Sequence, residues 1–467
     1  MAIKACFLMP HPPVLIERVG NGQERVCEKT LEALRELGRK VQTLGPKRII
    51  VISPHGPVFT DAIAIGGDAI LQGDLSAFGV PEEGVRKQND SALVERILRR
   101  ADLDDIPVVK IDRKSARDYR ISSTLDHGVL VPLHFIEKFW TDYSLVHISY
   151  GLLSNVTLYR FGMMLEQLLQ DESSPTLVIA SGDLSHSLKD SGPYQFHPDG
   201  PQFDQQLIED LRIGNFEGLL TQSPQLVRNA SECGLRSLAI ALGTLDGKVV
   251  QSTVHSYEGP FGVGYGVVSI DVEDVGCASR LNSLKILTDN RLKDDRALEG
   301  IHVRLARAVI EATARGESVE EIWDNAPTAL KTNRAGVFVS IKGPSGLRGC
   351  IGTTEPTTDS IGREIFENAI KASTEDPRFP SIHPDELDAL TISVDVLMPA
   401  EPVESKDLLD PHRYGVIVSS GYRRGLLLPD LEGVDTVDEQ LRIALNKAGI
   451  RESESYQIER FEVVRHH

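Results

Sequence analysis

The amino-acid sequence predicts two domains of different class: an N-terminal α/β domain, in which a sheet is layered with helices, and a C-terminal α+β domain. The chain has 467 residues, a length beyond which a single hydrophobic core seldom grows. In its first half, short apolar runs alternate with amphipathic stretches, which is typical of a sheet covered by helices. A polar stretch over residues 272–298 then precedes a different order of elements.

Four apolar runs of the first domain are expected to be buried strands, and four amphipathic stretches are expected to be helices. The strands are residues 3–9, 48–53, 144–149 and 176–181, and the helices are residues 23–43, 154–170, 203–213 and 231–243. A hairpin over 249–256 and 263–270 is expected to close the domain, because a Gly-rich turn joins these two runs.

The second domain is expected to begin with a helix after a polar linker. Its expected elements are helix 299–315, strand 335–341, helix 359–374, strand 389–397, strand 414–419, helix 436–448 and strand 456–465. The sequence therefore predicts a first domain over residues 1–275, a linker over 276–298 and a second domain over 299–467.

Charge and cysteine content exclude several classes of function. The formal net charge is −18, and no basic stripe of the kind that binds phosphate backbones is present. The five cysteines are scattered without a CxxC pair, which indicates a reducing compartment. Neither a signal peptide nor an apolar run of roughly 18 residues occurs. The protein is expected to be cytoplasmic, with neither nucleic acid nor membrane as a partner.

Three histidines follow three of the expected strands at nearly the same structural position. They are His11 in LMPHPP, His55 in ISPHGP and His186 in ASGDLSH. Because the carboxyl ends of strands in an open α/β sheet border the ligand crevice, residues just beyond them can meet in space. Pro and Gly beside His11 and His55 favour tight turns that present the side chain. A single loop histidine is usually only a hydrogen-bonding residue, but the three together predict one site.

Two histidine ligands need a third ligand to hold a metal ion. Glu232 and Cys233, in NASECGLRS before an expected helix, are the candidates. Two imidazoles with a carboxylate or thiolate leave open positions for substrate and dioxygen on non-heme iron. The alternative for Cys233 is a buried core thiol. His134 and His147 lie within apolar runs and are expected to be structural.

Several of these motifs resemble the LigB-type class III extradiol dioxygenases and their relative Memo over residues 3–272. The resemblance rests on motifs that occur in the family's order: PHPP at His11, SPHGP at His55, DHGVLVPL at Asp126, GDLSH at His186 and the pair Cys233-Gly234.

Carried over residue by residue, the resemblance implies that His11 and His55 are metal ligands and that His186 is the catalytic acid and base. His127 matches a second active-site histidine. The third ligand position falls on Cys233, where Memo also has cysteine and ring-cleaving members have glutamate. The resemblance implies a divalent metal, Fe(II) in the ring-cleaving members, and a small catechol-type substrate.

The second half resembles an AMMECR-type domain over residues 295–467. The matching motifs are LRGCIG at Leu347–Gly352, EDPRFPSIHPDEL at Glu375–Leu387, RGLLLP at Arg424–Pro429 and QLRIALNKAGI at Gln440–Ile450. A fusion of the two types resembles the AmmeMemoRadiSam system proteins A and B, which implies a radical SAM enzyme as a partner protein.

The LRGCIG motif allows two interpretations of its cysteine. The segment lacks the GK[ST] ending of a P-loop, so a hairpin turn is expected there. Cys350 is either a thiol activated by the neighbouring cation of Arg348 or a small residue buried on a strand.

Three functions follow from the first domain. The leading one is an iron-dependent oxidoreductase in which His186 moves protons and His127 stabilises developing negative charge. The second is a zinc hydrolase with His186 as general acid and base. The third is a metal-binding or redox-responsive scaffold, and its soft cysteine ligand would also suit copper.

Overall fold

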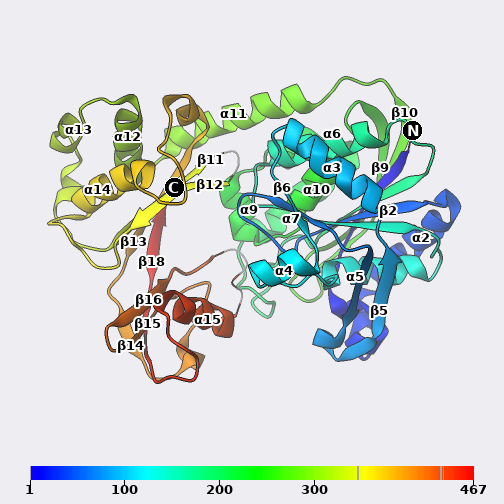
Figure 1. Ribbon diagram of the computed structural model, residues 1–467, viewed down its shortest axis with the longest axis horizontal. Coiled ribbons are helices and arrows are strands. Elements are labelled where there is room, and N and C mark those ends of the chain that lie inside the picture. Colours follow the sequence, from blue (N-terminus) through cyan, green and yellow to red (C-terminus); the bar gives the residue numbers. More distant parts are fainter. Residues whose placement is uncertain (1, 344–345, 432–433, 435) are drawn as a thin grey trace. The chain divides into compact units, whose positions relative to one another are not determined.

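The structure, a computed structural model, describes residues 2–343, 346–431, 434 and 436–467 (Figure 1). It contains two compact units, one built from the residues up to Arg291 and the other mainly from the residues that follow.

The first unit contains ten strands and a set of helices. Its strands are β1 (Ile3–Met9), β2 (Arg48–Ser53), β3 (Ile63–Gly66), β4 (Ile70–Leu75), β5 (Val80–Gln88), β6 (Val108–Ile111), β7 (Ser144–Ser149), β8 (Thr176–Ser181), β9 (Lys248–Glu258) and β10 (Tyr265–Val275). Its helices are α1 (Glu17–Gly20), α2 (Glu28–Leu44), α3 (Ser91–Leu103), α4 (Arg113–Tyr119), α5 (His127–Glu137), α6 (Asn155–Leu169), α7 (Asp199–Ile213), α8 (Phe216–Leu220), α9 (Pro224–Ala230) and α10 (Leu235–Gly243).

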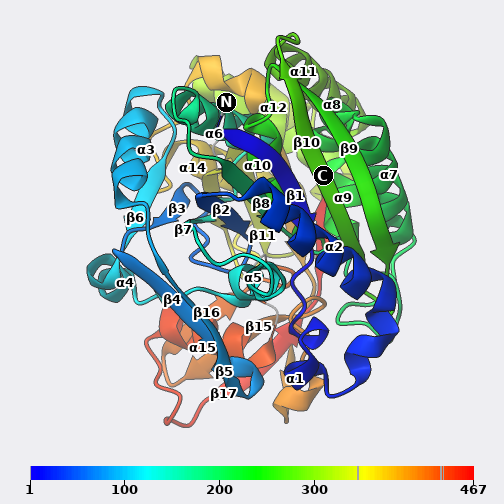
Figure 2. The ribbon, with the colours of Figure 1, turned by 90° about the vertical axis from the view of Figure 1, so that its right-hand side faces the viewer.

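An eight-stranded sheet, in the order β6-β3-β7-β2-β8-β1-β10-β9, is the frame of the first unit (Figure 2). The central strands β7, β2, β8 and β1 run parallel. The hairpin of β9 and β10 adds two antiparallel strands beside β1. Every residue of β2 and β8 is buried, as expected for parallel strands covered on both faces.

The two faces of this sheet belong to two hydrophobic cores, because successive side chains of a strand point to opposite faces. On β2, Ile50 and Ile52 join a core that includes residues of α3, α6 and α10. Ile49 and Val51 join the other core, with residues of α2 and α5. The predicted α/β class, with helices layered on a sheet, is therefore confirmed.

Two predicted helices begin later than the sequence suggested. The helix expected over 23–43 starts with a short 3-10 segment, Gln23–Cys27, before α2. The helix expected over 231–243 begins only at Leu235. The second difference matters for the site, because it leaves Glu232 and Cys233 in the loop between α9 and α10.

The stretch expected to be a polar linker, residues 276–298, is mostly helical. Helix α11 spans Leu281–Leu298, and the division between the two units falls within it, after Arg291. Leu284 is the buried side chain of this helix and belongs to a core of the first unit. A mainly polar sequence forms a helix here, although its low apolar content suggested a connector.

The second unit is α+β, as predicted, with two four-stranded sheets in the orders β12-β11-β13-β18 and β14-β17-β15-β16. Its strands are β11 (Val337–Gly343), β12 (Gly346–Gly352), β13 (Thr391–Leu397), β14 (Glu401–Val403), β15 (Gly415–Ser420), β16 (Arg423–Leu427), β17 (Gln457–Phe461) and β18 (Val463–His466). Its helices are α12 (Ile301–Arg315), α13 (Glu320–Asp324), α14 (Ile361–Thr374) and α15 (Val437–Ala448).

Two expectations for this unit need correction. The strand expected over 456–465 is split into β17 and β18, which lie in different sheets. The LRGCIG motif is part of β12 rather than a turn; residues 344–345, which precede it, lie outside the described residues. None of the helices in the described part of the chain has the length and apolar character that a membrane crossing requires.

Candidate metal centre

The three predicted histidines lie at one edge of the sheet because each follows one of three neighbouring parallel strands. In the order β2-β8-β1, His55 follows β2, His186 follows β8 and His11 follows β1. The chain leaves β1 and β2 through Pro10 and Pro54, which cannot donate a ladder hydrogen bond and so favour the end of each strand. The convergence of strand ends therefore accounts for the meeting of residues that are far apart in sequence.

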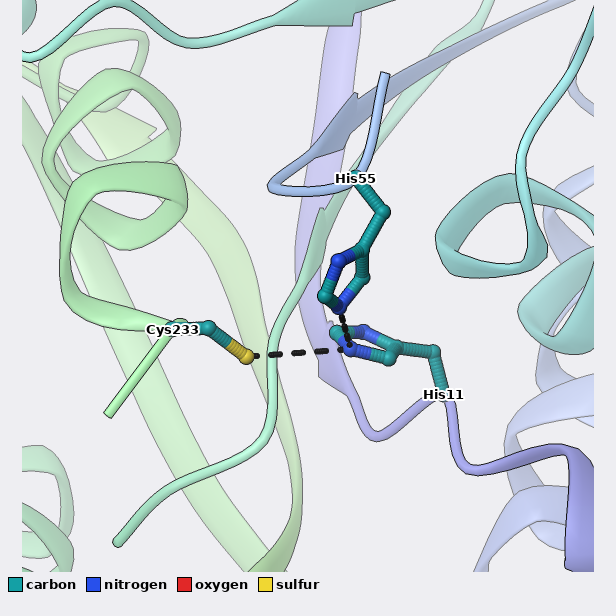
Figure 3. Close-up of side chains that lie close together, drawn as sticks. All are labelled: His11, His55 and Cys233. Atoms are coloured by element: carbon teal, nitrogen blue, oxygen red, sulfur yellow. Dashed lines mark hydrogen bonds between the residues drawn. The ribbon is translucent and has the colours of Figure 1, made fainter. Parts of the chain in front are cut away.

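His11, His55 and Cys233 form a compact group of three possible metal ligands. Their ligand atoms all lie within 4.8 Å of one another. The Nε2 atoms of His11 and His55 are 2.9 Å apart, and Cys233 Sγ lies 3.7 Å from His11 Nε2 (Figure 3). These atoms come from three separate loops and converge on one point.

The donor atoms of this group suit a divalent cation. Metal bonds are about 2.0–2.1 Å for histidine nitrogen and about 2.3 Å for thiolate sulfur, so two ligands of one tetrahedral ion lie roughly 3.3–3.6 Å apart. The contacts of 2.9 Å between His11 and His55 and of 3.7 Å between Cys233 and His11 lie on either side of this range. Without a cation, the facing nitrogens of His11 and His55 require one ring to donate to the other. With a cation, both nitrogens and the sulfur act as donors of lone pairs.

The electrostatic surroundings favour neutral imidazoles, the form that binds metals. His11 is only 1% exposed, and burial, with the nearby ring of His127, lowers its pKa well below the usual value. His55 reaches the surface, but desolvation of its ring and the rings of His11 and His127 lower its pKa as well. Both side chains are therefore unprotonated near pH 7.

Asp183 links the histidine side of the site to the cysteine side. Its Oδ1 accepts the backbone N–H of His11 at 3.0 Å, and its Oδ2 lies 3.7 Å from His11 Nε2. Its backbone N–H points to Cys233 Sγ at 3.3 Å, and the N–H of Cys233 donates to its carbonyl at 3.3 Å. Burial raises the pKa of Asp183 to about 6.

Two glycines allow these loops to approach closely. A Cβ atom on Gly182 would lie 2.2 Å from the Cα atom of Gly234, and a Cβ on Gly234 would lie 3.1 Å from the carbonyl oxygen of Asp183. A side chain at position 182 would clash with this contact between main chains, and one at position 234 would require a small shift of the Asp183 loop. The pair therefore sets the distance between the loop of Asp183 and the loop of Cys233.

His127 lies against the proposed ligands at the start of α5. Its ring stacks on His55 with a centroid distance of 4.2 Å and lies 5.4 Å from the ring of His11. Burial lowers its pKa. The preceding residue, Asp126, accepts a hydrogen bond from Ser53 Oγ at 2.6 Å, and Ser53 Oγ accepts the N–H of His55 at 3.2 Å. Asp126 thus joins the loop of His55 to the helix of His127.

His186 stands beside this group without belonging to the three ligands. Its ring contacts Tyr194 at a centroid distance of 5.6 Å, and its Nδ1 is buried without a hydrogen-bond partner in the described part of the chain. After burial and the charges of nearer groups, a positive charge on the His186 ring also lowers the pKa of His11 and of His55. His186 therefore lies within electrostatic range of these two histidines.

Glu232, the other candidate for the third ligand, is not brought into the group. Its Oε2 accepts the N–H of Leu235 at 2.6 Å, at the N-terminal end of α10, where carboxylates are favoured. The preceding Ser231 has a left-handed backbone with φ of 53°. The chain reverses there, and Cys233 rather than Glu232 joins the two histidines.

Sequence reasoning gave Asp126 and Asp183 no place in the set of site residues. Both belong to motifs that the sequence singled out, DHG and GDLSH, but their role depends on contacts across strands. His147, expected to be structural, lies 3.3 Å from Asp126 Oδ2 through its Nε2 atom. The continuous apolar run of β7, buried from Leu145 to Ser149, gave no sign of this contact.

Comparison with known proteins assigns both domains to families. The family described as the catalytic LigB subunit of aromatic ring-opening dioxygenase matches residues 5–268. The chain belongs to the LigB family. The AMMECR1 family matches residues 303–466, so a LigB domain and an AMMECR1 domain are fused in one chain. The metal-site group and the two accompanying histidines all lie within the LigB domain.

One relative matches over the whole of this chain, and others match only part of it. The protein CA_C1420 of Clostridium acetobutylicum is 41% identical over 467 residues, which cover 100% of this chain and 99% of that protein. A protein of Thermotoga maritima is 53% identical over 167 residues, which cover 35% of this chain and 96% of that protein. The uncharacterized Pyrococcus horikoshii protein PH0010 is 31% identical, with a TM-score of 0.32, and covers 35% of this chain and 88% of its own.

Proposed function

We propose that the LigB domain is a metal-dependent oxidoreductase of the extradiol dioxygenase type, with a small catechol-type molecule as substrate. The observation that carries this proposal is the convergence of His11, His55 and Cys233 within 4.8 Å. Membership of the LigB family supports the class of reaction. Fe(II) is the proposed metal, because it supplies a Lewis acid and open coordination positions for small oxygen ligands.

His186 is the proposed acid and base. Its Nδ1 lacks a hydrogen-bond partner among the described residues, so no described group fixes the protonation state of the ring, and we assign to this ring the transfer of a proton from a substrate hydroxyl and its later return. Proton transfer by a positioned side chain contributes about 10²–10⁴-fold to a rate. His127, stacked on His55, is placed to donate a hydrogen bond to negative charge that develops on the substrate.

Cys233 favours a second candidate function. A thiolate is a softer ligand than the carboxylate of ring-cleaving enzymes, and it suits zinc or copper as well as iron. With zinc, which activates water for hydrolysis, His186 would act as general acid and base of a hydrolase. With copper or zinc and no turnover, the LigB domain would be a metal-binding scaffold.

Metal content and oxygen consumption separate these functions. Protein purified without air and without added metal is analysed for elements and then mixed with a set of catechols while dissolved oxygen is recorded. Near-stoichiometric iron together with catechol-dependent oxygen consumption supports the dioxygenase. Stoichiometric zinc with hydrolysis of ester or amide substrates supports the hydrolase. Iron-loaded protein that consumes no oxygen with any catechol contradicts the leading proposal.

A radical SAM enzyme is the proposed partner protein, on the basis of the fusion of a LigB domain with an AMMECR1 domain. Affinity purification of the tagged full-length chain from its own cells, followed by mass spectrometry, tests this. A radical SAM enzyme that co-purifies in salt-resistant, stoichiometric amounts supports the proposal, and its absence under crosslinking contradicts it.

A further inference from the structure

The AMMECR1 domain brings two of its sequence motifs together at Cys350. LRGCIG lies on the edge strand β12, and the loop after α14 carries EDPRFPSIHPDEL. Asp376 Oδ2 accepts the backbone N–H of Cys350 at 2.8 Å, and Arg378 Nη2 donates to the carbonyl of Cys350 at 3.3 Å. The loop therefore holds the strand at the residue that carries the thiol.

Arg348, the cation that the sequence suggested as the activator of Cys350, has another role. Its guanidinium forms two hydrogen bonds with Glu386, at 2.7 and 2.9 Å. It also donates to the carbonyls of Pro380 and Ser381, at 2.6 and 3.0 Å. Glu386 thus neutralises the charge of Arg348. The hydrogen bonds of Arg348 hold the loop against β12, and Arg348 does not act on the thiol.

Three other cations lie within electrostatic range of the thiol, and they come from three separate elements. Arg378 comes from the loop after α14, Lys447 from α15 and Arg465 from β18. A negative charge on the Cys350 side chain acts to raise the pKa of each of these cations. For Arg378, the larger effect comes from Asp376, and both neighbours raise its pKa.

Two of these cations are balanced by carboxylates and the third is not. Arg378 binds Asp376 at 2.9 and 2.7 Å, and Arg465 binds Asp395 at 2.7 and 3.3 Å. In the part of the chain that the structure describes, Lys447 Nζ has no carboxylate partner and meets only the carbonyl of Leu426, at 3.5 Å. Among the described residues, Lys447 is therefore the one of these three cations whose positive charge no carboxylate balances.

The thiol itself is reachable and has no partner cysteine in its domain. Cys350 is partly exposed, and its Sγ lies 3.2 Å from the hydroxyl of Ser340. Cys350 is the sole cysteine of residues 292–467 in the sequence. A disulfide with another residue of the AMMECR1 domain cannot form, so any disulfide at Cys350 needs a sulfur from outside the domain.

We propose that Cys350 is the nucleophile of a second reactive site, which exchanges disulfides with small anionic disulfides. The Cys350 thiolate attacks one sulfur of the disulfide, a new S–S bond forms, and the original S–S bond breaks. The second half of the disulfide leaves as a thiolate and takes up a proton. Cys350 is oxidised while the disulfide is reduced, so no further electron acceptor is needed. Lys447 and the two arginines attract the anion. This site is independent of the function proposed for the LigB domain.

The first test compares an anionic and a neutral alkylating agent on the full-length protein at low salt. The rate constants of iodoacetate and iodoacetamide are measured at Cys350 by peptide mass spectrometry, with Cys277 as an internal control. Both thiols are partly exposed, but Cys277 belongs to the first unit. We expect the ratio of the two rates to be about tenfold higher at Cys350, the lower range for charge steering.

Two changes should remove this preference. Salt at about 1 M shortens the screening length to about 3 Å and should bring the ratio at Cys350 to that at Cys277. Lys447→Gln should lower the ratio several-fold. The matched control is Arg442→Gln, which removes an exposed charge from the same helix that pairs with Glu439 at 3.4 Å and should leave the ratio unchanged. Equal ratios at Cys350 and Cys277 in the wild-type protein at low salt overturn the proposal without any variant.

The second test uses disulfides as reactants. Oxidised glutathione is an anionic disulfide and cystamine is a cationic one. Mixed disulfide at Cys350 should form about tenfold faster with oxidised glutathione, and thiol reductant should reverse it. Faster reaction with cystamine, or mixed disulfide at Cys277 but none at Cys350, would show that the cations do not select the reactant.

Discussion

The LigB and AMMECR1 domains each place a cysteine in a group of ionisable side chains, and the two groups differ in charge. Cys233 faces two imidazoles whose pKa values are lowered, mainly by burial. Cys350 faces three cations, one of them without a carboxylate partner in the described part of the chain. Neutral nitrogen donors beside a thiolate suit a metal cation, whereas fixed cations beside a thiol suit an anion. The surrounding charge, and not the cysteine, decides which partner each thiol accepts.

Single carboxyl groups of the two domains also differ in what shifts their pKa. In the LigB domain, burial raises the pKa of Asp183 to about 6 and that of Asp204 to about 7. In the AMMECR1 domain, the hydrogen bonds of Arg378 hold the pKa of Asp376 well below its usual range. Burial therefore dominates the pKa of Asp183 and Asp204, whereas an ion pair dominates the pKa of Asp376.

The largest expected effect is loss of the metal. His11→Ala or His55→Ala removes one of three protein ligands, so the metal content of the purified protein should fall from near one ion per chain to near zero. Elemental analysis of dialysed protein measures it. The control is His134→Gln, because His134 pairs with Glu83 at 3.1 Å and is not one of the three ligands. If both alanine variants kept the metal, the first site would not be a cation site. The contrast between a cation site in the LigB domain and an anion site in the AMMECR1 domain would then fail.

The next effect separates proton transfer from metal binding. His186→Ala should leave metal content near that of the wild-type protein and lower turnover by about 10²–10⁴-fold, because His186 is the proposed acid and base. Metal content and oxygen consumption are measured on the same preparation. If the variant loses its metal, His186 is a ligand, and Cys233 no longer completes the set.

The third prediction concerns Asp204, whose carboxylate accepts the N–H of Ser185 at 2.7 Å and the hydroxyl of Tyr257 at 2.7 Å. Burial raises its pKa from 3.8 to about 7. A raised carboxyl pKa stabilises the folded state at low pH, and this contribution is lost as pH rises through about 7. Asp204→Asn cannot ionise. Relative to the wild-type protein, its free energy of unfolding should therefore rise by about 2 kcal/mol between pH 5.5 and 8.

The measurement must report on the first unit alone. The sequence has two tryptophans, Trp140 in the first unit and Trp323 in the second. Fluorescence of Trp140 in a Trp323→Phe background follows chemical denaturation of the first unit. Asp388→Asn, at a fully exposed side chain, should show no change with pH relative to the wild-type protein. A constant difference between Asp204→Asn and the wild-type protein would mean that burial does not hold this carboxyl neutral.

The smallest effect is expected from the contacts behind the ligands. His147 lies 3.3 Å from Asp126, which in turn fixes Ser53 and the backbone of His55. His147→Gln should weaken metal affinity by about tenfold, the lower range for residues that orient metal ligands. Competition with a coloured chelator measures the affinity, and His134→Gln is again the control. If the metal affinity were unchanged, the contacts behind the ligands would not contribute to metal binding.

Sequence patterns predicted the frame of the LigB domain well, because its central strands are buried on both faces. The apolar runs 3–9, 48–53 and 176–181 coincide with β1, β2 and β8. Helix α5 was not predicted, since Pro132 lies inside it and proline normally disfavours a helix interior. The short strands β3 and β6 span four residues each, which is too few for a periodic signal.

The choice among candidate site residues was harder to make from the sequence. The position of His11, His55 and His186 after strands was visible, because strand ends converge whatever the side chains are. The choice between Glu232 and Cys233 was not visible, because adjacent residues in a loop point in directions that depend on backbone angles such as the left-handed Ser231. The partners of Cys350 were also hidden, since Arg378, Lys447 and Arg465 come from three elements distant in sequence.

The contact between Gly182 and Gly234 sets how closely the two loops approach, whereas position 233 supplies the proposed metal ligand. A contact between main chains sets the closest approach of the two loops, and the side chain at position 233 adds one contact, from its Sγ to the backbone N–H of Asp183. The proposed third ligand can therefore change, from a thiolate to a carboxylate or the reverse, without loss of the main-chain contact. One fold can in this way serve metals of different softness by changing a single residue, provided that Gly182 is kept.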